Sequence, residues 1–304
     1  MKKNVLFAGL GNMGYPMARN LKSKSLFNVY GYDKIPSLVT KAAEEFSLDH
    51  HTSINYRDID CVISIVPDTN DLKNFYVNDG IFKECKEGTL LIDCSTIGNK
   101  NATEINKMVR DNGMVFVDAP VCGGVMKAAT GKLSFLVGAD NETIFSKAKD
   151  YLQYMAENVF DCKKVGNGQT VKVVNNMGIA IQMRSVIEMM MLGESLDIDA
   201  KTLANILVHC TSNCWALDTT NPVPNAVSTS PSNNDYEGGF KTKLMLKDVK
   251  LALDDAINKG INLKFAELIA QDFERVVEAG YGDKDFGYLY QLLSKTQNMN
   301  TTLK

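Results

Sequence analysis

The sequence lacks an excess of positive charge. Its 304 residues carry 33 lysines and arginines against 36 aspartates and glutamates, which gives a formal net charge of −3. Proteins that bind nucleic acids present a basic surface to the phosphate backbone. We therefore expect no nucleic-acid partner.

The sequence also lacks the uninterrupted apolar run of about 20 residues that a membrane-spanning helix needs. The longest candidate, residues 177–192, is interrupted by Gln182, Arg184 and Glu188. Residues 1–3 lead directly into a strand-like run, with neither the apolar core of a secretion signal nor the Arg- and Ser-rich pattern of an organelle presequence. We expect no membrane association, and either a cytoplasmic protein or one whose targeting segment is absent from this sequence.

Histidine is scarce, and the cysteines form no metal-binding pattern. The three histidines and seven cysteines are scattered, and the odd number of cysteines favours reduced thiols over a disulfide framework. Cys210 and Cys214 lie beside His209, but no second cluster of ligands completes a zinc site. We predict no metal, which argues against a zinc-dependent alcohol dehydrogenase.

What the first half does contain is a regular alternation of short apolar runs with amphipathic stretches. The runs that we predict to be strands are residues 5–9, 27–33, 60–67, 89–95, 114–119 and 133–138. Continuous apolar strands are typical of a sheet that is covered on both faces, and strand–helix–strand succession indicates a parallel one. We predict a Rossmann-type, doubly wound α/β domain over residues 1–166, with helices at 13–24 and 35–46.

From residue 167 onward the pattern predicts only helices. The first, residues 168–196, is apolar on nearly every face, and the following ones are residues 200–210, 239–258, 265–279 and 286–293. We predict a long connecting helix and an all-helical C-terminal domain over residues 167–304. Because one subunit can hardly bury every face of such a helix, we also expect a homodimer or a homotetramer.

A glycine-rich turn follows the first predicted strand. Residues Gly9, Leu10, Gly11, Asn12, Met13 and Gly14 have the spacing G-x-G-x-x-G. In dinucleotide-binding domains the first glycine permits the tight turn, the second lets the backbone approach the pyrophosphate, and the third lets helix pack on strand. The pyrophosphate then lies at a helix N-terminus, where free N–H groups and the helix dipole favour an anion.

The end of the second predicted strand indicates which dinucleotide binds. Asp33 lies at about the 20-residue offset at which a carboxylate contacts the adenosine ribose. A carboxylate there repels a 2′-phosphate, although Lys34 follows it and could soften that repulsion. We predict NAD as the cofactor.

Four motifs in one order resemble those of the β-hydroxyacid dehydrogenase family. They are GLGNMGYPMARNL (residues 9–21), DAPVCGG (118–124), GKLSFLVG (131–138) and GNGQTVKVVNN (166–176). The resemblance covers nearly the whole chain. Cys214-Trp215, residues 221–224 and residues 239–248 are similar to the 3-hydroxyisobutyrate dehydrogenases within this family.

The resemblance implies a role for each matching position. Lys172 would be the catalytic acid/base, and Asn176 would hold the substrate hydroxyl or the lysine. The substrate carboxylate would be bound by Cys122, Gly123 and Gly124. The cofactor would be contacted by Val66, Pro67, Asp71 and Thr96, and Lys247 would reach the cofactor or the substrate. Cys122 replaces the family's usual serine with a weaker donor, and Gly98 stands where an aspartate is common.

The residues themselves support this chemistry. Hydride removal from an alcohol requires a base for the hydroxyl proton. Lys172 and Asn176 lie one helical turn apart, and Gln169 joins the same polar face of an otherwise apolar helix. Two adjacent glycines, Gly123 and Gly124, allow backbone N–H groups to converge on an anion.

The resemblance implies oxidation of 3-hydroxyisobutyrate to methylmalonate semialdehyde, a step of valine breakdown located in the mitochondrial matrix of eukaryotes. A related tartronate semialdehyde reductase and a non-catalytic NAD-binding interaction module are the alternatives. The chain is too short for the large helical domain of 6-phosphogluconate dehydrogenase.

Overall fold

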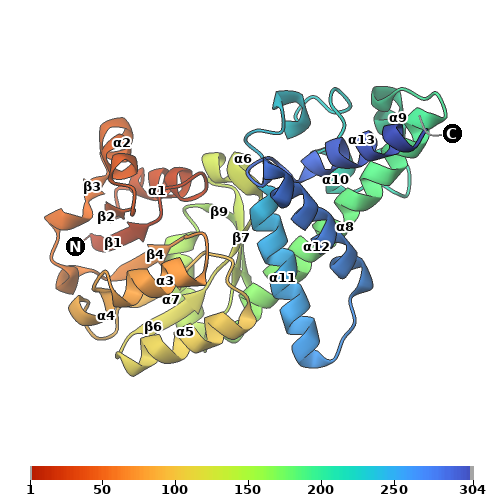
Figure 1. Cartoon of the computed structure of the whole chain (residues 1–304). Coiled ribbons are helices and arrows are strands. Elements are labelled where there is room, and N and C mark those ends of the chain that lie inside the picture. Colours follow the sequence, from red (N-terminus) through yellow and green to blue (C-terminus); the bar gives the residue numbers. More distant parts are fainter. Residues whose placement is uncertain (1, 302–304) are drawn as a thin grey trace. The chain divides into compact units, whose positions relative to one another are not determined.

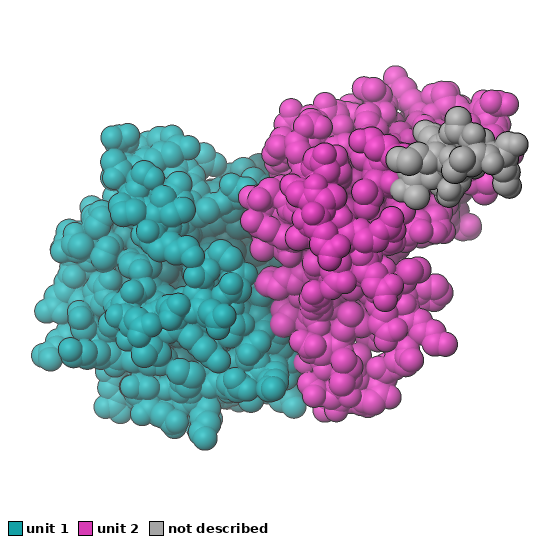
Figure 2. Space-filling model, in the orientation of Figure 1, with its two compact units in different colours: residues 1–172 teal, residues 173–304 magenta. Residues whose placement is uncertain are grey.

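The computed structural model describes residues 2–301, with side chains as far as residue 295. The chain forms two compact units, residues 1–172 and 173–304, which Figure 2 shows in different colours. The division falls within helix α8 (Asn167–Ser195). The predicted domain boundary after residue 166 lies at the start of the same helix and stays a prediction.

The first unit contains a parallel sheet with helices on both faces (Figure 1). Its six strands have the order β3-β2-β1-β4-β5-β6, and every described pair in it is parallel. The strands are β1 (Lys3–Ala8), β2 (Phe27–Tyr32), β3 (Asp49–His50), β4 (Cys61–Ser64), β5 (Leu90–Asp93) and β6 (Val115–Asp118). The helices are α1 (Gly14–Lys22), α2 (Pro36–Phe46), α3 (Thr69–Val77), α4 (Ile81–Glu84), α5 (Asn99–Asp111), α6 (Gly124–Thr130) and α7 (Glu142–Leu152). The predicted Rossmann-type fold is confirmed.

Alternate side chains of each central strand enter different cores, as the two-residue period of a strand requires. Val5 and Phe7 of β1 pack into the core that α1, α2 and α7 cover, whereas Leu6 packs into the core that α3, α4 and α5 cover. Strands buried on both faces have no polar side, so these segments appear in the sequence as continuous apolar runs.

A second, three-stranded sheet was not predicted. Its order is β7 (Val121–Cys122), β8 (Leu133–Val137) and β9 (Ala156–Asp161), with β7 antiparallel to β8. The predicted strand at 133–138 is therefore β8 of this sheet rather than a member of the large one. Strand β9 was missed because its side chains are half-buried or exposed and form no apolar run.

The regular elements of the second unit are all helices among its described residues, and loops connect them (Figure 1). After α8 come α9 (Ala200–Leu207), α10 (Trp215–Asp218), α11 (Thr242–Lys259), α12 (Lys264–Val276) and α13 (Leu289–Thr301), with short turns of 3-10 or π-helix between them. Its core is built from buried residues such as Met183, Ile187, Val249 and Phe273. Among residues 2–301, no helix has the length and apolar character needed to cross a membrane.

Candidate active site

The glycine-rich loop between β1 and α1 has the geometry that a dinucleotide requires. Gly9 has φ +93°, and a Cβ there would meet the carbonyl oxygen of Ile65 at 2.0 Å. A Cβ on Gly14 would meet the carbonyl oxygen of Gly9 at 1.8 Å. A Cβ on Gly11, in contrast, would meet nothing within 4 Å, so the space beside this glycine is open to a ligand. The close contacts at Gly9 and Gly14 and the open space at Gly11 are those expected of a turn whose second glycine a pyrophosphate approaches.

Asp33 follows β2 and binds the same loop. Its Oδ2 accepts a hydrogen bond from the Leu10 amide at 2.7 Å, and its Oδ1 accepts one from the Ile35 amide at 2.8 Å. Each carboxylate oxygen has a second lone pair, so these bonds leave acceptor capacity for ribose hydroxyls. The carboxylate that we predict to contact the ribose therefore also fixes the loop that faces the pyrophosphate.

Lys34 is held by an ion pair with Asp71 on α3. The ammonium lies 2.8 Å from Asp71 Oδ1, and this hydrogen bond raises the pKa of Lys34. Sequence reasoning placed both residues at the cofactor, but not in contact with each other. Their pairing means that the ammonium beside Asp33 already has a negative partner.

The loops after β4 and β5 are joined through a buried carboxylate. Asp93 Oδ1 accepts hydrogen bonds from Ser64 Oγ at 2.9 Å and from Ser95 Oγ at 2.7 Å, and Ser95 Oγ in turn accepts one from the Val66 amide at 2.9 Å. These hydrogen bonds fix the positions of Val66 and Ser95, which directly precede Pro67 and Thr96. We did not single out Asp93 from the sequence, where it ends an apolar run.

Lys172 lies beside the predicted carboxylate-binding segment. Its Nζ is 4.0 Å from Cys122 Sγ at the end of β7. Gly123 and Gly124, which follow, have φ values of +125° and +66°, and a Cβ on Gly124 would meet nothing within 4 Å. The first unit alone thus brings together the predicted base and the predicted anion-binding backbone.

The start of α8 is anchored by two fully buried side chains, Asp118 and Gln169. Asp118 accepts hydrogen bonds from the Gly166 amide at 2.7 Å and from the Gln169 amide at 2.9 Å. Burial raises the pKa of Asp118 to about 7, against the lowering effect of these two bonds. The first turn of helix α8 is therefore held by the carboxylate of Asp118, the last residue of β6.

The side chain of Gln169 is used inside the protein rather than at the substrate. Its Oε1 accepts hydrogen bonds from the amides of Ile97 and Gly98, at 2.9 and 3.2 Å, and its Nε2 donates one to the Ser95 carbonyl at 2.8 Å. Gln169 and Lys172 do have the expected helical spacing. The Gln169 side chain, however, is buried and bonded to the backbone of residues 95–98 instead of forming part of an open polar face. Gln169 ties α8 to the loop that contains Thr96.

In the second unit, Asn176 and Lys247 meet at one carboxylate. Asn176 Nδ2 donates to Asp248 Oδ2 at 2.5 Å, and Lys247 Nζ lies 3.1 Å from Asp248 Oδ1. Asp248 is 2% exposed, so the Lys247-Asp248 pair is not a solvated surface pair. Nothing in the sequence pattern links Asp248 to Asn176, because the two residues are 72 positions apart.

No group of three or more metal-binding side chains occurs among the described side chains, residues 2–295. The cysteines are unpaired thiols, and Cys210, beside which the sequence places Cys214 and His209, is exposed to solvent.

Two protein-family models cover most of the chain. One, described as the NAD binding domain of 6-phosphogluconate dehydrogenase, matches residues 4–166. The other, described as "NAD-binding of NADP-dependent 3-hydroxyisobutyrate dehydrogenase", matches residues 166–293.

Curated proteins and solved structures agree with these matches. The mitochondrial 3-hydroxyisobutyrate dehydrogenase of Rattus norvegicus is 39% identical over 97% of this chain and 88% of its own length. An NAD-dependent L-serine dehydrogenase of Pseudomonas aeruginosa is 35% identical over 97% of this chain and 99% of its own length. The structure of Mycobacterium tuberculosis 3-hydroxyisobutyrate dehydrogenase with L-serine superimposes with a TM-score of 0.86, at 35% identity, covering 96% of this chain and 99% of that one.

Proposed function

Because this chain belongs to the 3-hydroxyisobutyrate dehydrogenase family of NAD-binding oxidoreductases, we propose that it oxidises 3-hydroxyisobutyrate to methylmalonate semialdehyde with Lys172 as the acid/base. The observation that carries this proposal is the 4.0 Å contact between Lys172 Nζ and Cys122 Sγ. It sets an amine next to Gly123 and Gly124, whose backbone N–H groups can bind a substrate carboxylate, with open space beside Gly124.

The residues divide the chemistry among them. NAD⁺, when bound at the glycine-rich loop, supplies the hydride acceptor. Backbone N–H groups of Gly123 and Gly124 hold the substrate carboxylate, and Lys172 accepts the proton of the β-hydroxyl as the carbon loses its hydride. Asn176 and Lys247 of the second unit remain proposed substrate contacts. The fit of the loop to NAD rests on the open space at Gly11.

L-Serine is the second candidate substrate. It is also a small β-hydroxy acid, and it appears in the names of a P. aeruginosa relative and of the M. tuberculosis structure. A panel of 3-hydroxyisobutyrate, L-serine and D-glycerate, followed by NADH formation, decides between the candidates. We expect 3-hydroxyisobutyrate to give a kcat/KM at least about tenfold above the others, a difference of about 1.4 kcal/mol in transition-state binding. A higher value for L-serine would reassign the substrate, and no NADH with any of them would favour a non-catalytic NAD-binding module.

We propose that NAD is preferred over NADP, and that Asp71 contributes to this preference. Asp71→Asn should free the Lys34 ammonium for a 2′-phosphate. Surface ion pairs are worth up to about 1 kcal/mol, so we expect the ratio of kcat/KM for NADP to that for NAD to rise about three- to fivefold. Steady-state kinetics with both cofactors measures this ratio.

A matched control for this change is Asp140→Asn, which removes the same charge from an ion pair with Arg110 in the same unit. It should leave the cofactor ratio unchanged. In the double variant Asp71→Asn/Lys34→Ala the gain should disappear. If Asp71→Asn leaves the ratio at the wild-type value, the pair has no part in cofactor choice.

A homodimer or homotetramer remains our proposal for the assembly. Leu192, Leu196 and Ile206 of the second unit are each more than half exposed and offer apolar surface to another copy. The role in valine breakdown and the mitochondrial location follow only if 3-hydroxyisobutyrate is the substrate in a eukaryotic source.

A further inference from the structure

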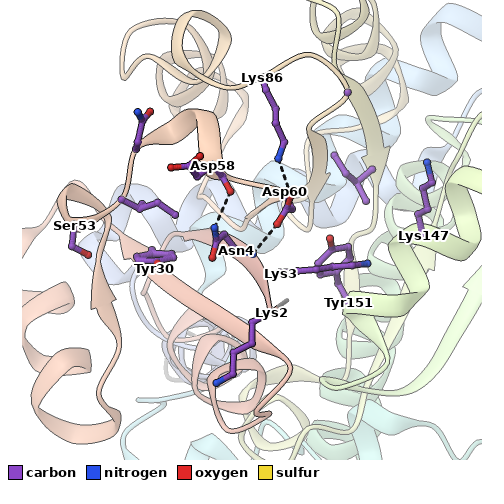
Figure 3. Close-up of a pocket in the computed structure, with 14 residues that line it drawn as sticks. Lys2, Lys3, Asn4, Tyr30, Ser53, Asp58, Asp60, Lys86, Lys147 and Tyr151 are labelled. Carbon is purple, nitrogen blue, oxygen red and sulfur yellow. Dashed lines mark hydrogen bonds and ion pairs between the residues drawn. The ribbon is translucent and has the colours of Figure 1, made fainter.

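A cavity of about 770 Å³ opens in the first unit at the amino-terminal ends of β1, β4 and β5 (Figure 3). The glycine-rich loop follows the carboxyl-terminal end of β1, and nucleotides bind at that edge of such sheets. The cavity is therefore at the opposite edge from the cofactor loop. Its volume is in the range of small-molecule sites.

Tyr151 of α7 places a phenol in this cavity. The residue is 4% exposed, its ring stacks on Phe27, and the Lys3 ammonium lies 5.0 Å from the ring centroid. None of the groups that the structure describes forms a hydrogen bond with its hydroxyl, which points into the cavity in Figure 3. Burial raises the pKa of Tyr151, so the group is a neutral O–H donor at physiological pH. A ligand oxygen that enters the cavity can therefore accept a hydrogen bond from this hydroxyl.

The carboxylate at the centre of the cavity is already engaged. Asp60 Oδ1 lies 2.8 Å from Lys86 Nζ, and Asp60 Oδ2 accepts a hydrogen bond from the Asn4 amide at 2.9 Å. These bonds hold the pKa of Asp60 below its usual value despite burial. Among the described residues, Lys86 is the only lysine of the lining within ion-pair distance of Asp60, although the charge of Lys3 also lowers the pKa of Asp60.

Three lysines of the lining have no carboxylate within ion-pair distance among the described residues: Lys2, Lys3 and Lys147. Lys147 precedes Tyr151 by four residues on α7, so both side chains lie on one face of that helix. Counting four lysines against Asp58 and Asp60, the lining has a net charge of +2. Ammonium groups and a phenol donor together are suited to a multiply charged oxyanion.

We propose that this cavity binds a small organic phosphate monoester. A phosphate monoester has a charge of about −1.5 to −2 at pH 7, which matches the net charge of the lining, and its oxygens can accept from several donors at once. Its oxygens accept a hydrogen bond from the Tyr151 hydroxyl and pair with Lys3 and Lys147, and its organic group packs on the ring of Tyr30. The site is separate from the cofactor loop and independent of the proposed substrate.

The test is a calorimetric titration of the NAD-saturated protein with phenyl phosphate, since NAD blocks phosphate binding at the glycine-rich loop. We expect a dissociation constant of about 1 mM or tighter. Lys147→Glu should weaken binding by about tenfold or more, and Tyr151→Phe, which removes only the hydroxyl, by about fivefold. Unchanged melting temperatures of both variants show that the fold persists.

Lys149→Glu is the matched control. It makes the same charge change on the same helix at an exposed position that does not line the cavity. It should leave the affinity for phenyl phosphate unchanged. The proposal is overturned by the absence of binding to the wild type, by equal weakening in Lys149→Glu, or by unchanged affinity in both Lys147→Glu and Tyr151→Phe.

Discussion

Lys172→Ala is expected to lower kcat by about 10²- to 10⁴-fold, the usual contribution of a positioned acid/base group. The ammonium end of this side chain lies 4.0 Å from Cys122 Sγ, beside the backbone that we assign to the substrate carboxylate. A base acts chiefly in the transition state, so kcat and kcat/KM should fall together. The affinity for NAD should change little, because the glycine-rich loop does not include this residue.

Stopped-flow or steady-state measurement of NADH formation, with NAD binding followed separately by fluorescence, tests this expectation. Lys164→Ala, which removes an exposed lysine shortly before the same helix, is the control and should keep full activity. A Lys172→Ala enzyme with a tenth of wild-type kcat would show that another residue is the base, and Lys247 would be the next candidate.

Asp118→Ala should have the second largest effect, mainly on stability. It leaves two buried amides, those of Gly166 and Gln169, without their acceptor. Each buried unsatisfied donor costs about 1–3 kcal/mol, so the loss is about 2–6 kcal/mol, a large part of the stability of an ordinary domain. We also expect kcat to fall by about tenfold, since Lys172 is three residues beyond the Gln169 amide.

Thermal or denaturant unfolding measures this loss, and Asp161→Ala is the matched control. Asp161 also accepts a hydrogen bond from a backbone amide, that of Lys163 at 2.8 Å, but at an exposed position where water can replace it. Its removal should cost less than about 1 kcal/mol. An equal loss of unfolding free energy in the two variants would mean that burial of the Asp118 carboxylate does not increase its contribution to stability.

The contribution of Asp118 to the free energy of unfolding should depend on pH. Its pKa is raised to about 7 in the folded protein, against about 3.9 in an unfolded chain. The folded state therefore binds more protons between these values, and the unfolding free energy falls as pH rises, by at most about 1.4 kcal/mol per pH unit. This contribution is complete below about pH 4 and lost above about pH 7. Asp118→Asn cannot titrate, so the wild type should lose stability relative to it from pH 5 to 8, and parallel curves would contradict the assignment.

Local signals in the sequence were sufficient for the nucleotide-binding fold. The spacing of Gly9, Gly11 and Gly14, and the apolar runs of the central strands, depend only on residues close together in the chain. The same signals missed β9, whose residues Ala156–Asp161 have no buried side chain to mark them. A strand of that kind is specified by its neighbour β8 rather than by its own composition.

The site was predictable only in part, because several of its contacts join distant residues. Helical spacing predicted that Gln169 and Lys172 lie near each other on one helix. It could not show that the Gln169 side-chain amide donates a hydrogen bond to the Ser95 carbonyl, 74 residues earlier. Likewise, Asp118 and Asp248 are carboxylates within motifs, and nothing in the spacing indicates which amides they accept from. Their roles depend on where the strands and helices end in space.

Every partner that holds the beginning of α8 precedes it in the chain. Ser95, Ile97 and Asp118 are all synthesised before Gly166 and Gln169. As the protein leaves the ribosome, the acceptors and donors that fix the first turn of this helix are therefore already present when the turn emerges. The position of Lys172 can accordingly be set during synthesis, before the second unit has folded.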